Sequence, residues 1–122
     1  FGGTGYDYPW SVITDGPGNI YLTGRIGNTV NYASDFGGSD IKPFAGTNDI
    51  YLTRINADGT YGWTKQFGGT GSDQGFSLAA DKSGNLYLAG VFIDTVDFDT
   101  GSEVFTGTSG GINGVYLLKL VQ

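Results

Sequence analysis

Residues 67–92, FGGTGSDQGFSLAADKSGNLYLAGVF, repeat a segment that the chain already carries at 1–26, FGGTGYDYPWSVITDGPGNIYLTGRI. The two segments share 13 identities at an offset of 66 positions, which chance does not produce. The register continues from NTVNY (28–32) to DTVDF (94–98), and from FAGTNDIYLTRI (44–55) to FTGTSGGINGVYLLKL (105–120). Such self-similarity indicates stacked supersecondary units of one kind. The sequence therefore predicts one unit at 1–66 and a second at 67–122.

Short runs with a period of two residues predict strands within each unit. The expected strands cover 9–14, 19–26, 49–56 and 60–67 in the first unit, and 75–80, 85–92 and 114–121 in the second. Between the first two strands stands DGPGN (15–19) or DKSGN (81–85), in which an Asp can bond the following backbone and a Gly supplies positive φ. Each unit is thus expected to be an antiparallel meander of four strands, the second lacking its outermost strand.

The faces of these strands distinguish a β-propeller blade from a β-sandwich. Ile20 and Leu22 alternate with Tyr21 and Thr23, so neither face of this strand is strongly polar. A sandwich sheet usually has one solvated face, whereas a blade is covered on both sides by its neighbours. The 23 glycines and the 15% of aromatic residues also fit many short strands joined by tight turns. We therefore predict an all-β chain of β-propeller blades.

Several motifs carry a resemblance to a known repeat: WTKQFGGTGSD (63–73), DKSGNLYLAG (81–90), VDF (96–98) and NDIYLTRINADG (48–59). Together they resemble the bacterial and archaeal β-propeller repeat family called SBBP, for seven-bladed beta-propeller. The resemblance implies the blade fold and an extracellular or cell-surface protein, often one with adhesion or binding modules. No catalytic residues are defined for that repeat, so the resemblance also implies a non-enzymatic role.

Charge and composition exclude several functions. The 12 acidic and 6 basic residues give a net charge of −6, which disfavours nucleic acid and anionic membrane surfaces as partners. No apolar run approaches the roughly 20 residues of a membrane-spanning helix. The chain has no His and no Cys, so Ser/His/Asp and Cys/His catalysis and histidine-based metal sites are excluded. We expect the chain not to be an enzyme.

The absent outermost strand of the second unit predicts an interaction surface. Residues 114–121 would form an edge that pairs with another chain, and two blades cannot close a ring of about 4 to 8. The expected interface residues are Val115, Leu117, Leu118, Leu120 and Val121. Adjacent repeats of a longer parent chain, or copies of this chain, would cover them. The expected function is a structural or interaction module that assembles through blade faces and strand complementation into a larger propeller or a filament.

A ligand-binding module is the alternative function. Tyr6, Tyr8 and Tyr32 have no strict counterpart in the second unit and are candidates for stacking on a glycan. Calcium is the one cofactor considered, because carboxylates in DTVDFDTGSE (94–103) are ligands that Ca²⁺ prefers. These candidate ligands are Asp94, Asp97, Asp99 and Glu103. The segment lacks the D-x-D-x-D-G core of a calcium loop, so a solvated acidic loop is the favoured interpretation.

Other residues recur at matching positions and predict structure instead of binding. We expect Asp7 and Asp73 to accept hydrogen bonds from backbone amides and so fix the crossing into each unit. Matching aromatic residues predict packing between blades. These residues are Trp10 with Phe76, Tyr21 with Tyr87, and Tyr51 with Tyr116.

Overall fold

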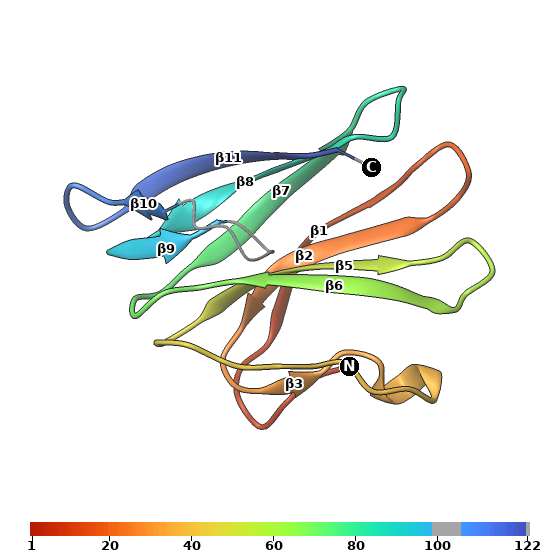
Figure 1. Cartoon of the computed structure of the whole chain (residues 1–122), viewed down its shortest axis with the longest axis horizontal. Coiled ribbons are helices and arrows are strands. Elements are labelled where there is room, and N and C mark those ends of the chain that lie inside the picture. Colours follow the sequence, from red (N-terminus) through yellow and green to blue (C-terminus); the bar gives the residue numbers. More distant parts are fainter. Residues whose placement is uncertain (99–105, 122) are drawn as a thin grey trace.

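Two antiparallel sheets dominate the computed structural model, which describes residues 1–98 and 106–121 (Figure 1). The first sheet has the order β1-β2-β5-β6, from β1 (Tyr8–Thr14), β2 (Ile20–Ile26), β5 (Asp49–Ile55) and β6 (Tyr61–Phe67). The second has the order β11-β8-β7, from β7 (Gln74–Ala80), β8 (Leu86–Phe92) and β11 (Gly114–Leu120). This topology confirms the predicted meanders, four strands in the first sheet and three in the second.

The hairpins that open the two sheets have the same predicted turn. The backbone N–H of Asn19 donates to the Asp15 carboxylate at 2.8 Å, and that of Asn85 donates to Asp81 at 3.0 Å. Gly18 and Gly84 have φ values of 94° and 81°, a region that favours glycine because it has no Cβ. Local turn chemistry therefore sets the register of each hairpin.

Short elements occupy the connection between the second and third long strands of each unit. In the first unit these are β3 (Val30–Asn31), the 3₁₀ turn η1 (Ser34–Phe36) and β4 (Ile41–Lys42). In the second they are β9 (Thr95–Asp97) and β10 (Thr106–Thr108). The strand predictions did not include them, because runs of two or three residues are too short to show a period.

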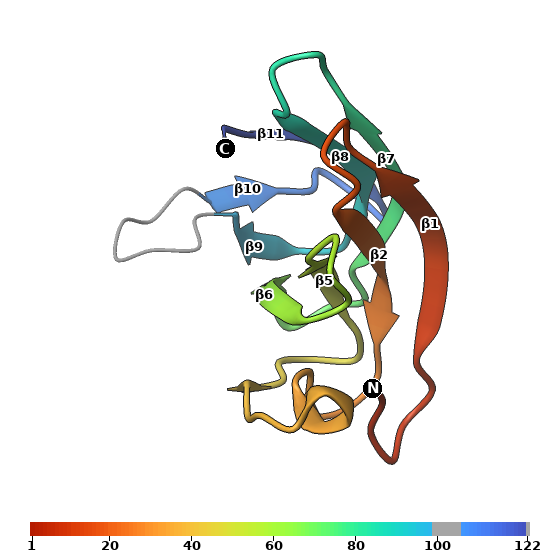
Figure 2. The same ribbon diagram turned by 90° about the vertical axis from the view of Figure 1, so that its right-hand side faces the viewer.

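The two sheets fan out from the neighbouring strands β1 and β7 toward β6 and β11, with β9 and β10 between the diverging edges (Figure 2). The core between the sheets contains Tyr21, Ile50 and Leu52 from the first and Leu78, Leu86 and Leu88 from the second. Gly75 allows the close approach, since a Cβ there would lie 2.4 Å from the Thr23 hydroxyl oxygen. This wedge is the arrangement of adjacent propeller blades.

A second apolar cluster covers part of the other face of the first sheet. It contains Ile26, Val30, Tyr32 and Tyr51, with Phe1 packed against them. The Phe1 and Tyr32 rings lie 5.1 Å apart. Their repeat counterparts, Phe67 and Phe98, lie 6.5 Å apart within the core between the sheets. Phe1 therefore packs against the first sheet in the way that Phe67, the last residue of β6, packs against the second sheet.

Candidate docking surfaces

The outer face of the first sheet, defined by Val12, Ile20 and Leu22, is apolar and incompletely covered. Val12 is 62% exposed and Ile20 39% exposed, and Leu22 is half-buried. A groove of about 230 Å³ runs beside them, lined by Pro9, Trp10, Ser11, Val12 and Leu22. The repeat counterparts of the three defining residues are Leu78, Leu86 and Leu88, which are buried against the first sheet.

The outer face of the second sheet, defined by Val115 and Leu117, is exposed, whereas the corresponding face of the first sheet is buried. These side chains are 83% and 71% exposed. Their counterparts in β5 are Ile50 and Leu52, each 0% exposed because the second sheet covers them. The two outer faces thus repeat the two halves of the interface that already joins the sheets.

The free edge of β11 is a third apolar surface. Among the described residues β11 pairs only with β8, whereas its counterpart β5 lies between β2 and β6. Leu118 and Leu120 are half-buried and pack toward the core between the sheets, and Val121, beyond the strand, is 76% exposed. The five predicted interface residues therefore lie on both faces of β11 and at its end.

An exposed aromatic row follows the start of the first sheet. The rings of Tyr6 and Tyr8 lie 6.5 Å apart, and those of Tyr8 and Trp10 lie 5.9 Å apart. The Arg25 guanidinium lies 4.8 Å from the centre of the Tyr8 ring. Tyr6 is 79% exposed, so two of the three tyrosines predicted for glycan binding do lie together on the surface.

Tyr32, the third predicted tyrosine, does not belong to this row. It is fully buried in the second apolar cluster, and its hydroxyl donates to Gln66 Oε1 at 3.0 Å. Burial raises the pKa of its phenol. The prediction that Tyr32 lines a ligand-binding surface is wrong, because the segment that follows β2 folds back and packs this ring against Phe1.

Trp10 and Phe76 are more exposed than the core prediction required, at 47% and 42%. Each occupies an irregularity in the pairing of its strand, between Pro9 and Ser11 in β1 and between Gly75 and Ser77 in β7. A bulge adds one residue and turns its side chain out of the regular alternation. The two rings still meet edge to face at 5.7 Å, so they join the sheets along an exposed edge.

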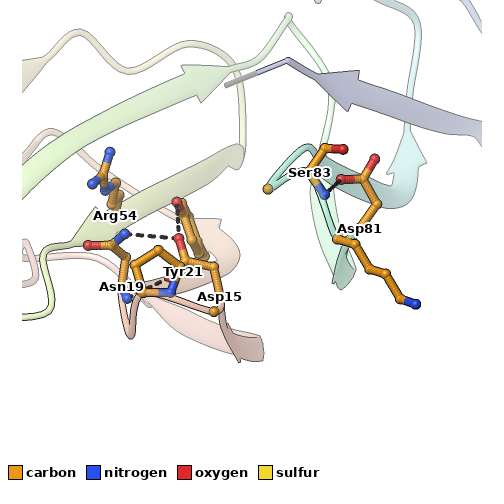
Figure 3. A pocket seen from close by; sticks show the side chains of 10 residues that line it. Asp15, Asn19, Tyr21, Arg54, Asp81 and Ser83 are labelled. Carbon is orange, nitrogen blue, oxygen red and sulfur yellow. Dashed lines mark hydrogen bonds between the residues drawn. The ribbon is translucent and has the colours of Figure 1, made fainter.

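A groove of about 580 Å³ lies between the two hairpin turns at 15–19 and 81–85 (Figure 3). Its two carboxylates are already bonded within the turns. Asp15 accepts from Asn19 and from the Tyr21 hydroxyl, and Asp81 accepts from Asn85 and Ser83. These bonds lower the pKa of both carboxyls. Both carboxylates that line the groove therefore stabilise the turns, and they do not form a metal site together.

The acidic segment proposed for calcium is only partly described. Asp94 is exposed with φ 65°, and Asp97 belongs to β9. Asp99 and Glu103 lie outside the described residues. Within 1–98 and 106–121 no group of three metal-ligating side chains is present. The favoured interpretation of this segment as a solvated acidic loop, and the alternative of a calcium site, both stay predictions.

Asp49, at the start of β5, has a perturbed pKa. Its Oδ2 accepts bonds from the Ala45 N–H at 3.0 Å and from Gln66 Nε2 at 2.8 Å, while the buried Oδ1 has no hydrogen-bond partner. Burial raises the pKa to about 6, and the charge on Asp73 adds to the rise. The folded state therefore holds a proton on Asp49 at a pH where the unfolded chain, with a pKa near 3.9, has released it.

This difference predicts that Asp49 makes the protein less stable as pH rises from about 4 to about 6. Asp49→Asn removes the titrating group, so the loss of stability over this range should be smaller by about 2 kcal/mol than in the wild type. Urea unfolding at pH 4 and pH 7 measures it. Subtracting the variant's pH dependence cancels the contribution of the other carboxyls. An equal change in the free energy of unfolding between pH 4 and pH 7 in both proteins would contradict the prediction.

The fold and its surfaces define a pair of β-propeller blades. Residues 62–91 match SBBP, described as a beta-propeller repeat, from β6 through most of β8. The match confirms the resemblance and spans the crossing from one sheet to the next. No curated protein matches the chain significantly. Within the described residues, no helix has the length and apolar character to cross a bilayer.

Proposed function

We propose that this protein is a non-catalytic interaction module whose outer faces and free strand edge bind neighbouring blades, building a larger propeller or a filament. The observation that carries the proposal is the repeat relation between exposed and buried leucines. Leu117 is 71% exposed while its counterpart Leu52 is 0% exposed under the second sheet. The partners are copies of this chain or adjacent repeats of a longer one.

Head-to-tail contact follows from this relation. The outer face of the first sheet corresponds in the repeat to Leu78, Leu86 and Leu88, which form one side of the interface between the sheets. The outer face of the second sheet corresponds to Ile50 and Leu52, which form the other side. One chain can thus present its second sheet to the first sheet of the next chain. Because this contact joins two different surfaces, it produces rings or open filaments and not an isolated pair.

Two charged variants test the head-to-tail contact. Val12→Asp blocks the outer face of the first sheet, and Leu117→Asp blocks that of the second, because a carboxylate is costly to desolvate there. We expect the wild type to form assemblies larger than two chains. Each variant alone should stay a single chain, while an equal mixture should form pairs and nothing larger. Size-exclusion chromatography with light scattering measures these masses.

Ser39→Asp is the matched control, since Ser39 is an exposed loop residue outside both faces. It should assemble like the wild type. Circular dichroism confirms that each variant is folded. A wild type that stays a single chain up to its solubility limit, or a mixture that grows beyond pairs, contradicts head-to-tail contact between copies of this chain.

Extracellular or surface location is part of the proposal and is supported by the resemblance to SBBP repeats.

A second candidate function, glycan binding, is favoured by the exposed row of Tyr6, Tyr8 and Trp10, because aromatic faces can stack on sugar rings. A glycan array followed by titration of Trp fluorescence tests it. Binding that is unchanged in Tyr6→Ala would place the glycan elsewhere.

A further inference from the structure

The pairing of β5 with β6 shows what a fourth strand would meet at the free edge of β11. In the first sheet Thr64 lies opposite Thr53, and Gln66 lies opposite Tyr51. The repeat places Leu118 of β11 at the position of Thr53, and Tyr116 at that of Tyr51. The environment of each β6 residue can therefore be compared with the environment that the edge of β11 offers.

The first difference is at the position of Thr64. In the first sheet the hydroxyls of Thr53 and Thr64 bond to each other at 2.8 Å, and both side chains are buried. Leu118 has no hydroxyl and packs toward the core between the sheets. A threonine brought opposite Leu118 would lose this partner and keep only the Tyr61 hydroxyl of its own strand, which donates to Thr64 Oγ1 at 2.8 Å. An apolar side chain there would extend the core.

The second difference is at the position of Gln66. Its Oε1 accepts from the Tyr32 hydroxyl at 3.0 Å, and its Nε2 donates to Asp49 Oδ2 at 2.8 Å. The counterparts of these partners are Phe98 and Gly114, which have neither hydroxyl nor carboxylate. Nε2 also donates to the main-chain oxygen of Pro43, whose counterpart lies outside the described residues.

Gly114 cannot be replaced by an acid without rearrangement. A Cβ on it would lie 2.6 Å from the Phe92 ring, a buried part of the core. The space that holds the Asp49 carboxylate in the first sheet is thus not available in the second. A glutamine opposite Tyr116, which is itself buried, would lose two of its three side-chain partners.

We propose that the free edge of β11 binds an extended segment that is apolar at both positions, opposite Leu118 and opposite Tyr116, and that it discriminates against β6 of another copy. The inference rests on the proposed function and specifies its strand partner. On the other strand face, Lys119 has the same charge as its counterpart Arg54, which pairs with Trp63 of β6. We therefore expect the partner strand to keep an aromatic residue opposite Lys119. The partner is thus a related blade strand that differs from β6 on one face.

Two synthetic peptides test this specificity. One has the sequence of residues 58–69, and the other carries Thr64→Val and Gln66→Val in the same segment. The titration follows the anisotropy of a fluorophore on each peptide as the full chain is added. We expect the double-valine peptide to bind at least about five-fold tighter, since Thr64 and Gln66 each lose hydrogen-bond partners at this edge while valine adds apolar contact to the core. A smaller gain, or no binding by either peptide, overturns the inference.

Two controls separate recognition of the β11 edge from nonspecific hydrophobic binding. A Lys65→Val peptide places its added apolar side chain beside Leu117, which corresponds to the Leu52 that pairs with Lys65 and is 71% exposed, so it should gain less affinity than the double-valine peptide. Leu118→Thr in the protein restores a hydroxyl, so it should reduce the advantage of valine at position 64. An equal gain from Lys65→Val overturns the inference. The mass measurements on the Val12→Asp and Leu117→Asp variants use no peptide, so a failed titration leaves their result on the proposed function unaffected.

Discussion

Replacing Leu52 by alanine should lower the free energy of unfolding by about 2–5 kcal/mol, as expected for the loss of a fully buried leucine. Leu52 is 0% exposed, in the core where β5 meets the second sheet. Alanine removes apolar contacts to both sheets and leaves a cavity between two rigid surfaces that cannot readily collapse. Urea unfolding followed by circular dichroism measures the change.

Leu117→Ala is the matched control, because the same side chain occupies the repeat-related position on β11. Leu117 is 71% exposed, so its replacement should change the stability of a single chain by no more than about 0.5 kcal/mol. The same variant should reduce assembly, since Leu117 defines the outer face of the second sheet. Similar losses of stability in the two variants would mean that the sheets do not pack as described.

The first three long strands of each unit and the turns at 15–19 and 81–85 were predictable because each pattern occurs twice. Asp15 and Asp81 have the same spacing to the following Asn and Gly, and both accept the predicted turn bonds. The same holds for Asp7, which accepts from the amides of Gly3 and Gly27. A single copy of either motif would have left the alternation of strand and turn open to other interpretations.

Burial was harder to predict where the two units differ. Tyr32 aligns with Phe98, which was a sign of a core position, but the loop that covers Tyr32 has no regular period. At Trp10 and Phe76 the strands bulge, and a period-two pattern cannot show which residue is the extra one. The apolar edge of β11 was predicted from the sequence, but the correspondence between the outer faces and the buried interface emerged only from comparing the exposure of repeat-related residues, a quantity that three-dimensional packing determines.

Asp73 connects the two sheets through backbone amides, and its removal should be one of the most damaging single changes in the chain. Its carboxylate is fully buried and accepts from the Gly69 N–H at 2.9 Å and from the Ile93 N–H at 3.1 Å. The first amide lies in the crossing from β6 to β7, the second just after β8. We expect Asp73→Ala to lower the free energy of unfolding by about 2–5 kcal/mol, because two partly buried amides lose their fully buried acceptor.

Asp7→Ala is the paired measurement, since Asp7 makes the equivalent bonds to Gly3 and Gly27. Asp7 is only half-buried, and its bond to Gly3 is exposed, so water can replace it at a cost of about 1 kcal/mol or less. Hydrogen exchange separates a local from a general effect: in Asp73→Ala the amides of Gly69 and Ile93 should lose protection before those of β2 and β5. Equal losses of stability in the two variants, or unchanged protection at Gly69, would show that the crossing is held by the glycine backbone and not by the carboxylate.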